Sequence, residues 1–596
     1  MKRPLFLRAA LLLLGLLALN ATSFGATRWV TTVVDDPGLA GSLRYEIGIA
    51  NNGDDILFDP SLAGLQIFLT HGEILVNKHL DIYGPTGRTT LTTPDNFRMF
   101  HIDLPNPSYQ VRIRDLNFKH GFAIDGGGAI LMADWGTLHV NDCNFTDNIA
   151  RSYTGSTQGG AIWARNSSAI HLTDCVFKNN RAETGVEEAR GGAVATDNNN
   201  FLTVFDCVFE DNWTNTLAST PMHTSYGGAI AVLEAELMVQ RSDFIGNEAQ
   251  SSNGRSYGGA ISCDATDVDL RGVGFRENKA DATGGALDMR HEGQTAFIMW
   301  CEFTDNEALI GGGLCTSQIM RMENCTVGRN IASQTGGGIA LLPFTVAPLS
   351  GGTGTFISAC TIAENECTSG IGGGVIAVPF SPAPYTRLYH SIVSGNVHAT
   401  HPNVRGDLES FGHNVLSDDG GPDFISLPSD LLNTNPLLGP LDFYGGPRRG
   451  YTLFPGSPAI DKSTFGSGLP FDVRGLGFVR EYGGAQDAGS LEMQPIPGAK
   501  TSPSTDIETK TFTASVFPNP FHVQAHIRFS LPQADEVRVV LYNIAGEIVR
   551  ELWNGSVNAQ ESVEIPVDGQ DLTPGIYLFQ VVSPKNGTQS GKMVHH

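Results

Sequence analysis

Paired carboxylates are the first residues in this sequence that could do chemistry. Two acids on either side of a glycosidic bond can act as general acid and base, and several acids beside a basic residue could hold calcium during bond cleavage. Two candidate pairs occur, Asp264 with Asp267 and Glu187 with Glu188. Because both pairs lie in polar stretches typical of solvated loops, we do not assign them as catalytic residues or calcium ligands.

Histidine and cysteine could supply bases or metal ligands, but their spacing argues against it. His139, His171 and His291 are expected on strand faces or in loops. None of the nine cysteines forms a Cys-x-x-Cys motif or a Cys/His cluster with the spacing of a zinc site. The sequence therefore assigns no catalytic, cofactor-binding or metal-binding residue, and calcium is the only metal ion that its acidic loops suit.

Most of the chain repeats one sequence pattern, and the fold that this pattern forms must position any functional residue. The stretch GGAIWARNSSAIHLTDCVFKNNRA, residues 159–182, has one close copy before it and another after it. A large apolar residue with Asn three positions later closes each copy, from Phe145 and Asn148 to Val393 and Asn396. A fixed period of this length predicts a solenoid. Paired glycines open the copies at Gly127, Gly159, Gly191, Gly227, Gly258 and Gly284, and in looser form at Gly311, Gly336 and Gly372.

Within a copy the apolar residues alternate, as in a β-strand. Leu138 and Val140 lie at even-numbered positions, whereas Phe145 lies at an odd-numbered one. One extra residue beside Asp142 is therefore predicted to turn a corner. In residues 297–303 the apolar positions show no such switch. Two or three short strands joined by corners make one coil. Stacked coils predict an all-β fold, a right-handed parallel β-helix.

The repeated residues have structural interpretations. Paired glycines suit a corner with positive φ or close backbone approach, and Asn suits a left-handed corner in which stacked amides form a ladder. Phe and Cys are expected to stack inside the coils. Matched cysteines on neighbouring coils would lie about 4.8 Å apart with parallel Cα–Cβ vectors, which is poor geometry for a disulfide. We therefore predict a column of buried, reduced thiols: Cys143, Cys175, Cys207, Cys301, Cys325 and Cys360.

Composition and the N-terminus restrict the class of partner. With 70 glycines and 17% charged residues, the chain is typical of a turn-rich all-β protein. Its formal net charge of −24 argues against nucleic acid as a partner, because binding phosphates needs a basic surface. Lys2, Arg3 and Arg8 precede an apolar run, which predicts a secretory signal peptide over residues 1–26. No later segment approaches the roughly 18 apolar residues of a transmembrane helix.

The Gly-Gly-Ala-Ile and Phe-x-x-Asn elements resemble the repeats of the chlamydial polymorphic outer-membrane proteins and of other bacterial surface proteins with pectin-lyase-like β-helices. This resemblance implies a cap and first coils over 27–125, repeats over 126–398, and closing coils over 399–494. In the cap segment GSLRYEIGIANNGDDILFDPSLAG, Ser42 is placed to cap a short helix, with Leu43, Ile47 and Ala50 facing the first coil. GSPAIDKS and DVRGLGFVREYGGAQDAGSLE are similar to the closing stretch of the same proteins.

A second domain follows the Pro/Ser/Thr-rich residues 495–511, which are typical of a linker. Residues 512–596 alternate in short strands and predict a small β-sandwich. Three motifs resemble the C-terminal sorting domain of the type IX secretion system: Pro518-Asn519-Pro520-Phe521, Leu541-Tyr542-Asn543 with Gly546, and Gly575-Ile576-Tyr577 with Lys592-Met593-Val594. The resemblance implies that residues 512–596 engage that machinery, and that the protein is secreted or attached to the outer-membrane surface.

Pectin-lyase-like folds often bind or cleave acidic polysaccharides, so an enzymatic role has to be weighed. Polygalacturonase-like hydrolases resemble one another in Asn-Thr-Asp, Asp-Asp, Gly-His-Gly and Arg-Ile-Lys motifs. This chain offers only the fragments ANNGDDILF (50–58) and VRIRDL (111–116), outside the central coils. Irregular insertions lengthen particular coils, and loops on a rigid scaffold usually carry binding specificity. These insertions are ETGVEEAR (183–190), NTLASTPMHTSY (215–226), SSNGRSY (251–257) and LLPFTVAPLSGGTGTF (341–356).

We favour a secreted or cell-surface scaffold for adhesion or glycan binding, without enzymatic activity, whose partner is a glycan or a host or cell-surface ligand. Two alternatives remain: a polysaccharide lyase or glycoside hydrolase acting on an acidic polysaccharide, and a structural surface-layer protein. The fold alone does not decide among them, because one fold hosts many functions. Release of unsaturated or reducing sugars would identify the enzyme, whereas saturable glycan or cell binding would identify the scaffold.

Overall fold

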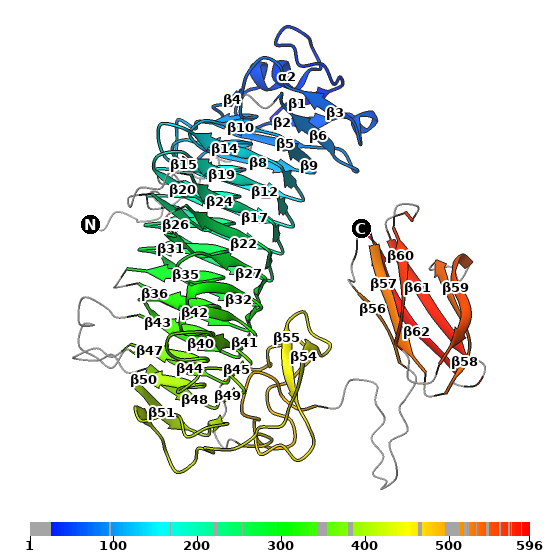
Figure 1. Cartoon of the computed structure of the whole chain (residues 1–596). Coiled ribbons are helices and arrows are strands. Elements are labelled where there is room, and N and C mark those ends of the chain that lie inside the picture. The colour runs from blue at the N-terminus through cyan, green and yellow to red at the C-terminus, as the bar shows by residue number, and fades with distance from the viewer. Residues whose placement is uncertain are drawn as a thin grey trace, which may run out of the picture. The chain divides into compact units, whose positions relative to one another are not determined.

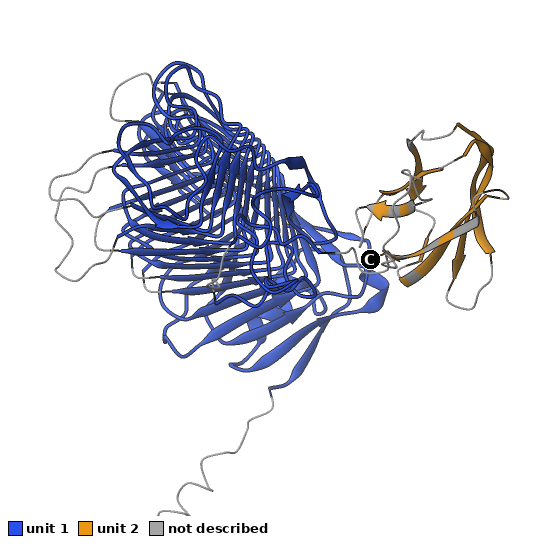
Figure 2. Ribbon diagram, turned by 90° about the horizontal axis from the view of Figure 1, so that it is seen from below, with its two compact units in different colours: residues 1–496 blue, residues 497–596 orange. Residues whose placement is uncertain are grey.

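The computed structural model of the chain describes residues 25–494 and 513–595 apart from short internal gaps. The gaps are 95–96, 167, 199, 218–222, 253, 292–293, 343–353, 379–385 and 463–467 in the first stretch, and 518–520, 522–523, 532, 544–547, 559–561, 570–571, 574, 584 and 586 in the second. The chain divides into two compact units, residues 1–496 and 497–596 (Figure 2). The predicted signal peptide up to residue 24 and the predicted linker lie outside the described residues.

The first unit opens with the short helix expected in the cap. Helix α2 (Leu43–Ile49) begins after Ser42, whose hydroxyl oxygen accepts a hydrogen bond from the Tyr45 N–H at 3.2 Å. Leu43 and Ile47 are buried against the first coil, as predicted. The Lys78 ammonium donates to the Gly48 carbonyl at 3.2 Å. It therefore satisfies one of the carbonyls that a helix end leaves without an internal partner.

One coil contains several short strands, each in a different sheet. β11 (Ile130–Met132) lies in sheet C, β12 (Thr137–Asn141) in sheet A, β13 (Asn144–Thr146) in sheet B, β14 (Ile149–Ser152) in sheet D and β15 (Thr157–Gln158) in an added sheet. Each strand pairs in parallel with its equivalent one coil later, so that Phe145 lies beside Phe177. The coils stack into the column of strands seen in Figure 1. The predicted parallel β-helix architecture is confirmed.

Stacking produces four long parallel sheets. Within the described residues, sheet A has 15 strands, from β1 (Thr27–Val30) to β53 (Phe424–Ile425), and sheet B has 13, from β3 (Gln66–Phe68) to β52 (Val415–Leu416). The same residues give sheet C 12 strands, from β4 (Ile74–Val76) to β50 (Val404–Gly406), and sheet D nine, from β10 (Phe122–Ala123) to β46 (Glu366–Cys367). The inner faces of these sheets enclose one continuous hydrophobic core.

Left-handed residues make the corner between sheets A and B. Asp142, Asp174 and Asp206 have φ values of 50°, 53° and 54°. Aspartate tolerates this conformation better than most residues, because its short side chain can bond to nearby backbone. The predicted corner beside each of these aspartates is therefore confirmed.

The same corner occurs in residues 297–303, where none was predicted. Trp300 has a φ of 56°, and the strand before it, β36 (Thr295–Met299), turns Ala296 and Ile298 toward the core. Phe297 points outward and is 43% exposed. The prediction was wrong because it counted a large aromatic residue as core, although the smaller alanine beside it is the buried one.

Paired glycines make the corner that leads into sheet C, for the two reasons expected. Gly159, the first of its pair, has a φ of 59°. The second, Gly160, lies so close to the next coil that a Cβ would stand 2.1 Å from the Gly192 carbonyl oxygen. Positive φ and close approach thus act on successive residues, and together they exclude any side chain from the corner.

The Asn residues form a buried ladder of side-chain amides. Asn180 donates from Nδ2 to the Phe145 carbonyl and to Asn212 Oδ1, both at 2.9 Å, and its Oδ1 accepts from the Asn148 N–H at 3.1 Å. The predicted left-handed conformation belongs instead to the preceding residue, such as Asn179 with a φ of 55°. The ladder comprises Asn148, Asn180, Asn212, Asn247, Asn278, Asn306, Asn330, Asn365 and Asn396.

Phe and Cys fill the interior in columns, as predicted. The phenyl rings of Phe145 and Phe177 stack with centroids 4.7 Å apart, and the column runs from Phe118 to Phe303. All nine cysteines are described, buried and free of disulfides. This agrees with the predicted reduced thiols.

The thiols also make hydrogen bonds, which the sequence prediction did not include. Cys207 Sγ lies 3.4 Å from the Cys175 backbone nitrogen and 3.2 Å from the Phe205 carbonyl oxygen. On the next coil Ser242 occupies the same place and accepts from the Cys207 N–H at 3.1 Å. The position therefore requires a small side chain that accepts a hydrogen bond from the backbone N–H of the preceding coil and donates one to a carbonyl of its own coil. Cysteine and serine can both do this.

The second unit is a small antiparallel β-sandwich, as predicted. One sheet contains β56 (Thr513–Phe517), β57 (Gln524–Ser530) and β60 (Ser562–Asp568), and the other contains β59 (Ile548–Val557), β58 (Asp535–Asn543), β61 (Gly575–Ser583) and β62 (Gly587–His595). Of the expected export motifs, Phe521, Tyr577 and Met593 are buried in the shared core. Residues 518–520 and Gly546 lie outside the described residues.

Replacing Asn180 by Ala should lower the free energy of unfolding by about 3 kcal/mol. The change leaves the Asn148 N–H and the Phe145 carbonyl buried without these partners, and each such group costs roughly 1 to 3 kcal/mol. Chemical denaturation followed by circular dichroism measures the loss. Asn179→Gly is the matched control, because that exposed residue already has a φ that glycine adopts freely. Equal stability of the two variants would contradict a structural role for the ladder.

Candidate functional site

The acids that the sequence offers for chemistry are held by neighbouring coils and do not converge. Asp264 contacts the ring of His291, and Asp267 accepts a hydrogen bond from a backbone N–H of the next coil at 2.8 Å. Glu187 accepts from the Ser156 hydroxyl at 2.8 Å. Within the described part of the chain, no three His, Cys, Asp or Glu side chains come together as a metal site. These acids therefore stabilise turns.

His139 and His171 lie on the outer face of sheet A, where they were expected. Their rings stack with centroids 4.7 Å apart on β12 and β17 (Ala169–Thr173). Burial and the neighbouring His171 lower the pKa of His139 to about 4, and burial also lowers the pKa of His171. Both rings are uncharged at neutral pH and belong to the surface of the sheet.

The two hydrolase-like fragments lie two strands apart in sheet A, with one strand between them. Asp55 on β2 (Asp54–Phe58) lies beside Asp81 on β5 (Leu80–Tyr83), and Asp81 lies beside Arg112 on β8 (Gln110–Arg114). Arg112 Nη1 is 3.2 Å from Asp81 Oδ1. Burial raises the pKa of Asp55, and the negative charge of Asp81 adds to the effect. Asp81 is thus paired with Arg112, whereas the neighbouring Asp55 has a raised pKa and holds its proton more tightly.

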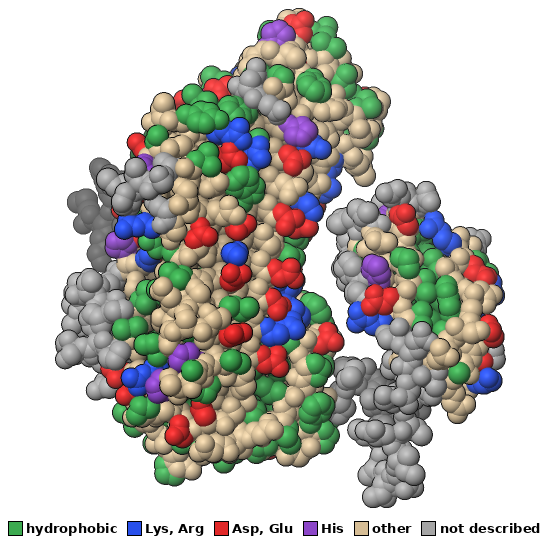
Figure 3. Space-filling model, in the orientation of Figure 1, with side chains coloured by type: hydrophobic (Ala, Val, Ile, Leu, Met, Phe, Trp, Pro, Cys, Tyr) green, Lys and Arg blue, Asp and Glu red, His purple; other side chains and the backbone are tan. Residues whose placement is uncertain are grey.

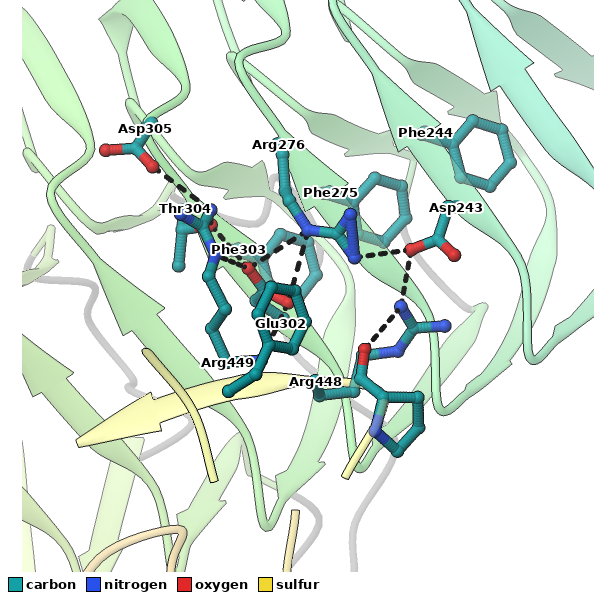
Figure 4. A network of polar contacts seen from close by, with 12 residues as sticks. Asp243, Phe244, Phe275, Arg276, Glu302, Phe303, Thr304, Asp305, Arg448 and Arg449 are labelled. Carbon is teal, nitrogen blue, oxygen red and sulfur yellow. Dashed lines mark hydrogen bonds and ion pairs between the residues drawn. The ribbon is translucent and has the colours of Figure 1, made fainter. Parts of the chain in front are cut away.

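The most extensive polar network joins sheet B to the strap, residues 438–494 (Figure 4). The strap begins with a hairpin of β54 (Leu438–Phe443) and β55 (Arg449–Leu453). Glu302 on β37 (Glu302–Thr304) is fully buried, lies 3.2 Å from Arg276 Nε, and accepts from the Arg449 N–H at 3.0 Å. Asp243 Oδ1 is 2.6 Å from Arg276 Nη2 and also contacts Arg448.

This network locks the strap in place and leaves little for a ligand. Burial raises the pKa of Glu302, but Arg276 and Arg449 outweigh it and hold that pKa below its usual range. Further along the strap, the Trp300 indole N–H donates to the Phe471 carbonyl at 3.0 Å, and Tyr451 OH donates to the Ala363 carbonyl at 3.2 Å. The charges of the network are satisfied by one another, so we interpret it as a structural clamp.

Three of the predicted loop insertions contribute strands to a fifth sheet. β20 (Glu188–Arg190), β25 (Thr224–Tyr226) and β30 (Ser256–Tyr257) pair in parallel with one another and with β15. The prediction of irregular loops is therefore wrong for these residues, because a neighbouring coil supplies backbone partners that one coil alone cannot reveal. The described ends of these insertions are fixed parts of the solenoid wall.

The added sheet and β35 (Leu287–Arg290) of sheet C together form a group of two arginines and two tyrosines, which we call the Arg–Tyr cluster: Arg190, Tyr226, Tyr257 and Arg290. The tyrosine rings stack with centroids 5.4 Å apart. The Arg290 guanidinium lies 4.0 Å from the Tyr257 ring centre and 4.8 Å from that of Tyr226. Arg190 lies 4.5 Å from the Tyr226 ring centre. Each guanidinium thus gains a cation–π contact.

Acidic and hydroxyl groups behind the cluster hold the arginines in place. Asp288 Oδ2 lies 2.7 Å from Arg290 Nε, and Arg290 Nη2 donates to Ser262 Oγ at 3.4 Å. Glu188 Oε2 accepts from Arg190 Nη2 at 2.7 Å. Asp288 is buried, and burial raises its pKa although Arg290 opposes the change. The cluster is therefore ordered before any ligand arrives, which lowers the entropy lost on binding.

The chemistry of the cluster suits binding better than bond cleavage. Burial raises the pKa of Tyr226, so its phenol keeps its proton at neutral pH and is a poor base. Aromatic faces and guanidinium groups together fit a ligand with flat apolar faces and anionic groups. The side chains of Arg190 and Arg290 are 15% and 24% exposed, so part of each remains at the surface.

The cluster was not predicted from the sequence, although one feature of the repeats points to it. Arg190, Tyr226 and Tyr257 each stand directly before a Gly-Gly opening, at the position held by Gln158 in the copy before them. Aligning this position through the repeats would have revealed two tyrosines and an arginine in one column. Arg290 joins them from β35 (Leu287–Arg290) on a later coil, so its contact could be found only in three dimensions.

The described surface of the first unit that is visible in Figure 3 carries charges of both signs. On the described surface visible in Figure 3, acidic, basic and apolar side chains are interspersed along the first unit without an extended basic area. With a formal net charge of −24, such a surface gives no support for a nucleic-acid partner. Among the described residues, no helix is long and apolar enough to span a bilayer.

Two family models match parts of the chain. The model of a right-handed β-helix region matches residues 108–244, and the model of a secretion system C-terminal sorting domain matches residues 515–596. Comparison with curated proteins and with solved structures finds no match. The chain thus carries a β-helix region and a type IX sorting domain, and the protein is secreted or attached to the cell surface.

Replacing Glu302 by Gln should release the strap. The change keeps the shape of the side chain but leaves Arg276 and Arg449 without their buried counter-charge, which should cost about 3 kcal/mol or more. We expect faster proteolysis within residues 438–494. Glu210→Gln is the matched control, because its ion pair with Lys178 on the same sheet is exposed and worth less than about 1 kcal/mol. Indistinguishable cleavage of the two variants would contradict the clamp.

Proposed function

We propose that the protein is an exported β-helix scaffold that binds glycans at the cell surface through the Arg–Tyr cluster, in the manner of an adhesin. Residues 27–494 form the scaffold in this proposal, and residues 512–596 serve export. The observation that carries it is the added sheet: successive coils contribute an extra strand, and those strands place Arg190, Tyr226 and Tyr257 in one ordered column. A coil that only had to close the core would not need this strand.

The geometry of the cluster favours a linear ligand that runs along the solenoid. Tyr226 and Tyr257 lie in register on neighbouring strands, which are about 4.8 Å apart, and Arg190 lies one strand further along. A polymer with a repeating flat face could contact one coil after another.

The residue types favour a sugar polymer that carries carboxylates. Tyrosine presents a large, rigid face and a polar tip, which suits the mixed apolar and hydroxyl surface of a sugar ring. A guanidinium can bind a carboxylate through two parallel hydrogen bonds. The resemblance of the repeats to chlamydial surface proteins supports a role in adhesion.

A glycan-binding titration tests this proposal. We expect the purified protein to bind a soluble polyuronate more tightly than a neutral polysaccharide of similar length. Tyr226→Ala and Arg190→Gln should each weaken binding about tenfold, equivalent to about 1.4 kcal/mol. Arg241→Gln is the matched control, because this exposed arginine pairs with Asp206 at the corner between sheets A and B, away from the cluster. Equal affinity of all variants would remove the cluster as the binding site.

A glycoside hydrolase is the second candidate, and the Asp55–Asp81 pair is the observation that favours it. Asp81 is paired with Arg112 while the pKa of Asp55 is raised, so Asp55 could donate a proton to a leaving group and Asp81 could remain charged. An assay for reducing ends released from polyuronates and neutral glycans tests this. Activity that Asp55→Asn abolishes would establish the enzyme. Without release or binding, the structural surface-layer role would remain.

A further inference from the structure

Asp54 is a buried carboxylate directed at the start of the first strand. It is 2% exposed. Its Oδ1 accepts a hydrogen bond from the Ala26 backbone nitrogen at 2.8 Å, and its Oδ2 accepts from Arg28 Nε at 2.8 Å and from the Asn51 N–H at 2.9 Å. The Ala26 carbonyl in turn accepts from the Asp55 N–H at 3.0 Å. The backbone N–H and the carbonyl of Ala26 are therefore both hydrogen-bonded at the point where sheet A begins.

The residues before Ala26 have the pattern of a signal peptidase site. Ser23 and Gly25 are both small and are separated by Phe24, which is the small-x-small arrangement found immediately before the cut. A cut after residue 26, where the predicted signal peptide ends, would instead place Phe24 where a small residue is needed. Ala21 and Ser23 have the same spacing, so the sequence allows two bonds, and the contact to Asp54 selects the bond after Gly25.

We propose that signal peptidase hydrolyses the Gly25–Ala26 bond and that the new α-ammonium group of Ala26 forms an ion pair with the buried Asp54 carboxylate. One water molecule is consumed: Gly25 leaves with a carboxylate, and the freed Ala26 amine takes up a proton. The charged nitrogen is the atom that donates to Asp54 as an amide in the uncut chain. Processing therefore converts a neutral donor at this site into a charged one.

The surroundings of Asp54 suit an added positive charge. Arg28 is the cation bound to it, at 2.8 Å. The Lys78 ammonium is directed at the carbonyls at the end of α2, including that of Ala50 at 2.8 Å. An α-ammonium group would add a second cation in direct contact with the Asp54 carboxylate. A charged donor to a buried carboxylate also makes a stronger hydrogen bond than an amide.

The first experiment identifies the first residue of the exported protein. The full chain is expressed in a host with type IX secretion, and the secreted or surface-released product is analysed by N-terminal sequencing and by mass spectrometry of its N-terminal peptide. We expect Ala26 as the first residue. Any other first residue, Phe24 or Thr27 included, would overturn the proposal.

The second experiment measures whether the α-amino group is held as an ion pair. Acylation of the N-terminal peptide is followed by mass spectrometry at pH 7.5 in the native mature protein and in the same protein unfolded in denaturant. A paired ammonium is a poor nucleophile, so we expect acylation at least about tenfold slower in the native protein. Equal rates in the two states would overturn the ion pair.

Two variants assign that protection to Asp54. Asp54→Asn should restore fast acylation, whereas Asp59→Asn should leave it slow. Asp59 is the matched control, because it caps the neighbouring 3-10 helix η1 (Pro60–Leu62) by accepting from the Ser61 N–H and does not touch Ala26. Slow acylation that persists in a folded Asp54→Asn variant would overturn the assignment. If that variant does not fold, the comparison of native and unfolded wild type still decides the question.

Discussion

Each coil of this protein depends on hydrogen bonds that it cannot make alone. Parallel stacking places equivalent residues one strand apart, so every buried amide of the Asn ladder needs the amide of the next coil, as Asn180 needs Asn212. Paired glycines are required for the same reason, since Gly160 lies against the Gly192 carbonyl. Repetition therefore follows from the need to satisfy buried backbone and side-chain groups in every coil.

The same constraint separates the parts of the chain that can change from those that cannot. Side chains at inner positions must pack against the equivalent residues of the next coil, whereas side chains at outer positions only have to avoid clashing with it. The outer surface thus carries two different structures: the strap, clamped to sheet B by Glu302 and its arginines, and the added sheet with the Arg–Tyr cluster. The charges of the strap and of the cluster are both paired within the protein, and the cluster adds two stacked tyrosine rings. We therefore expect recognition at the cluster.

Periodic features could be predicted from the sequence, and features made by contact between distant segments could not. The Phe column, the buried thiols and the Asp142 corner follow from alternation within a single copy. Phe297 misled the prediction because residue size was taken as a sign of burial. The added strands contain only two or three residues each, too few to show a pattern, and Arg449 reaches Glu302 from 147 residues away. Arg290 likewise meets Tyr226 only because the coils stack.

Hydrogen–deuterium exchange of the full chain, with and without a saturating polyuronate, tests most directly whether the scaffold and the binding site are separate. We expect added protection in peptides containing β20, β25, β30 and Arg290, with no change along the Asn ladder, which is already buried. Protection on the outer face of sheet A around Asp55 and Asp81, or none near Tyr226 and Tyr257 at saturation, would contradict a binding site at the Arg–Tyr cluster.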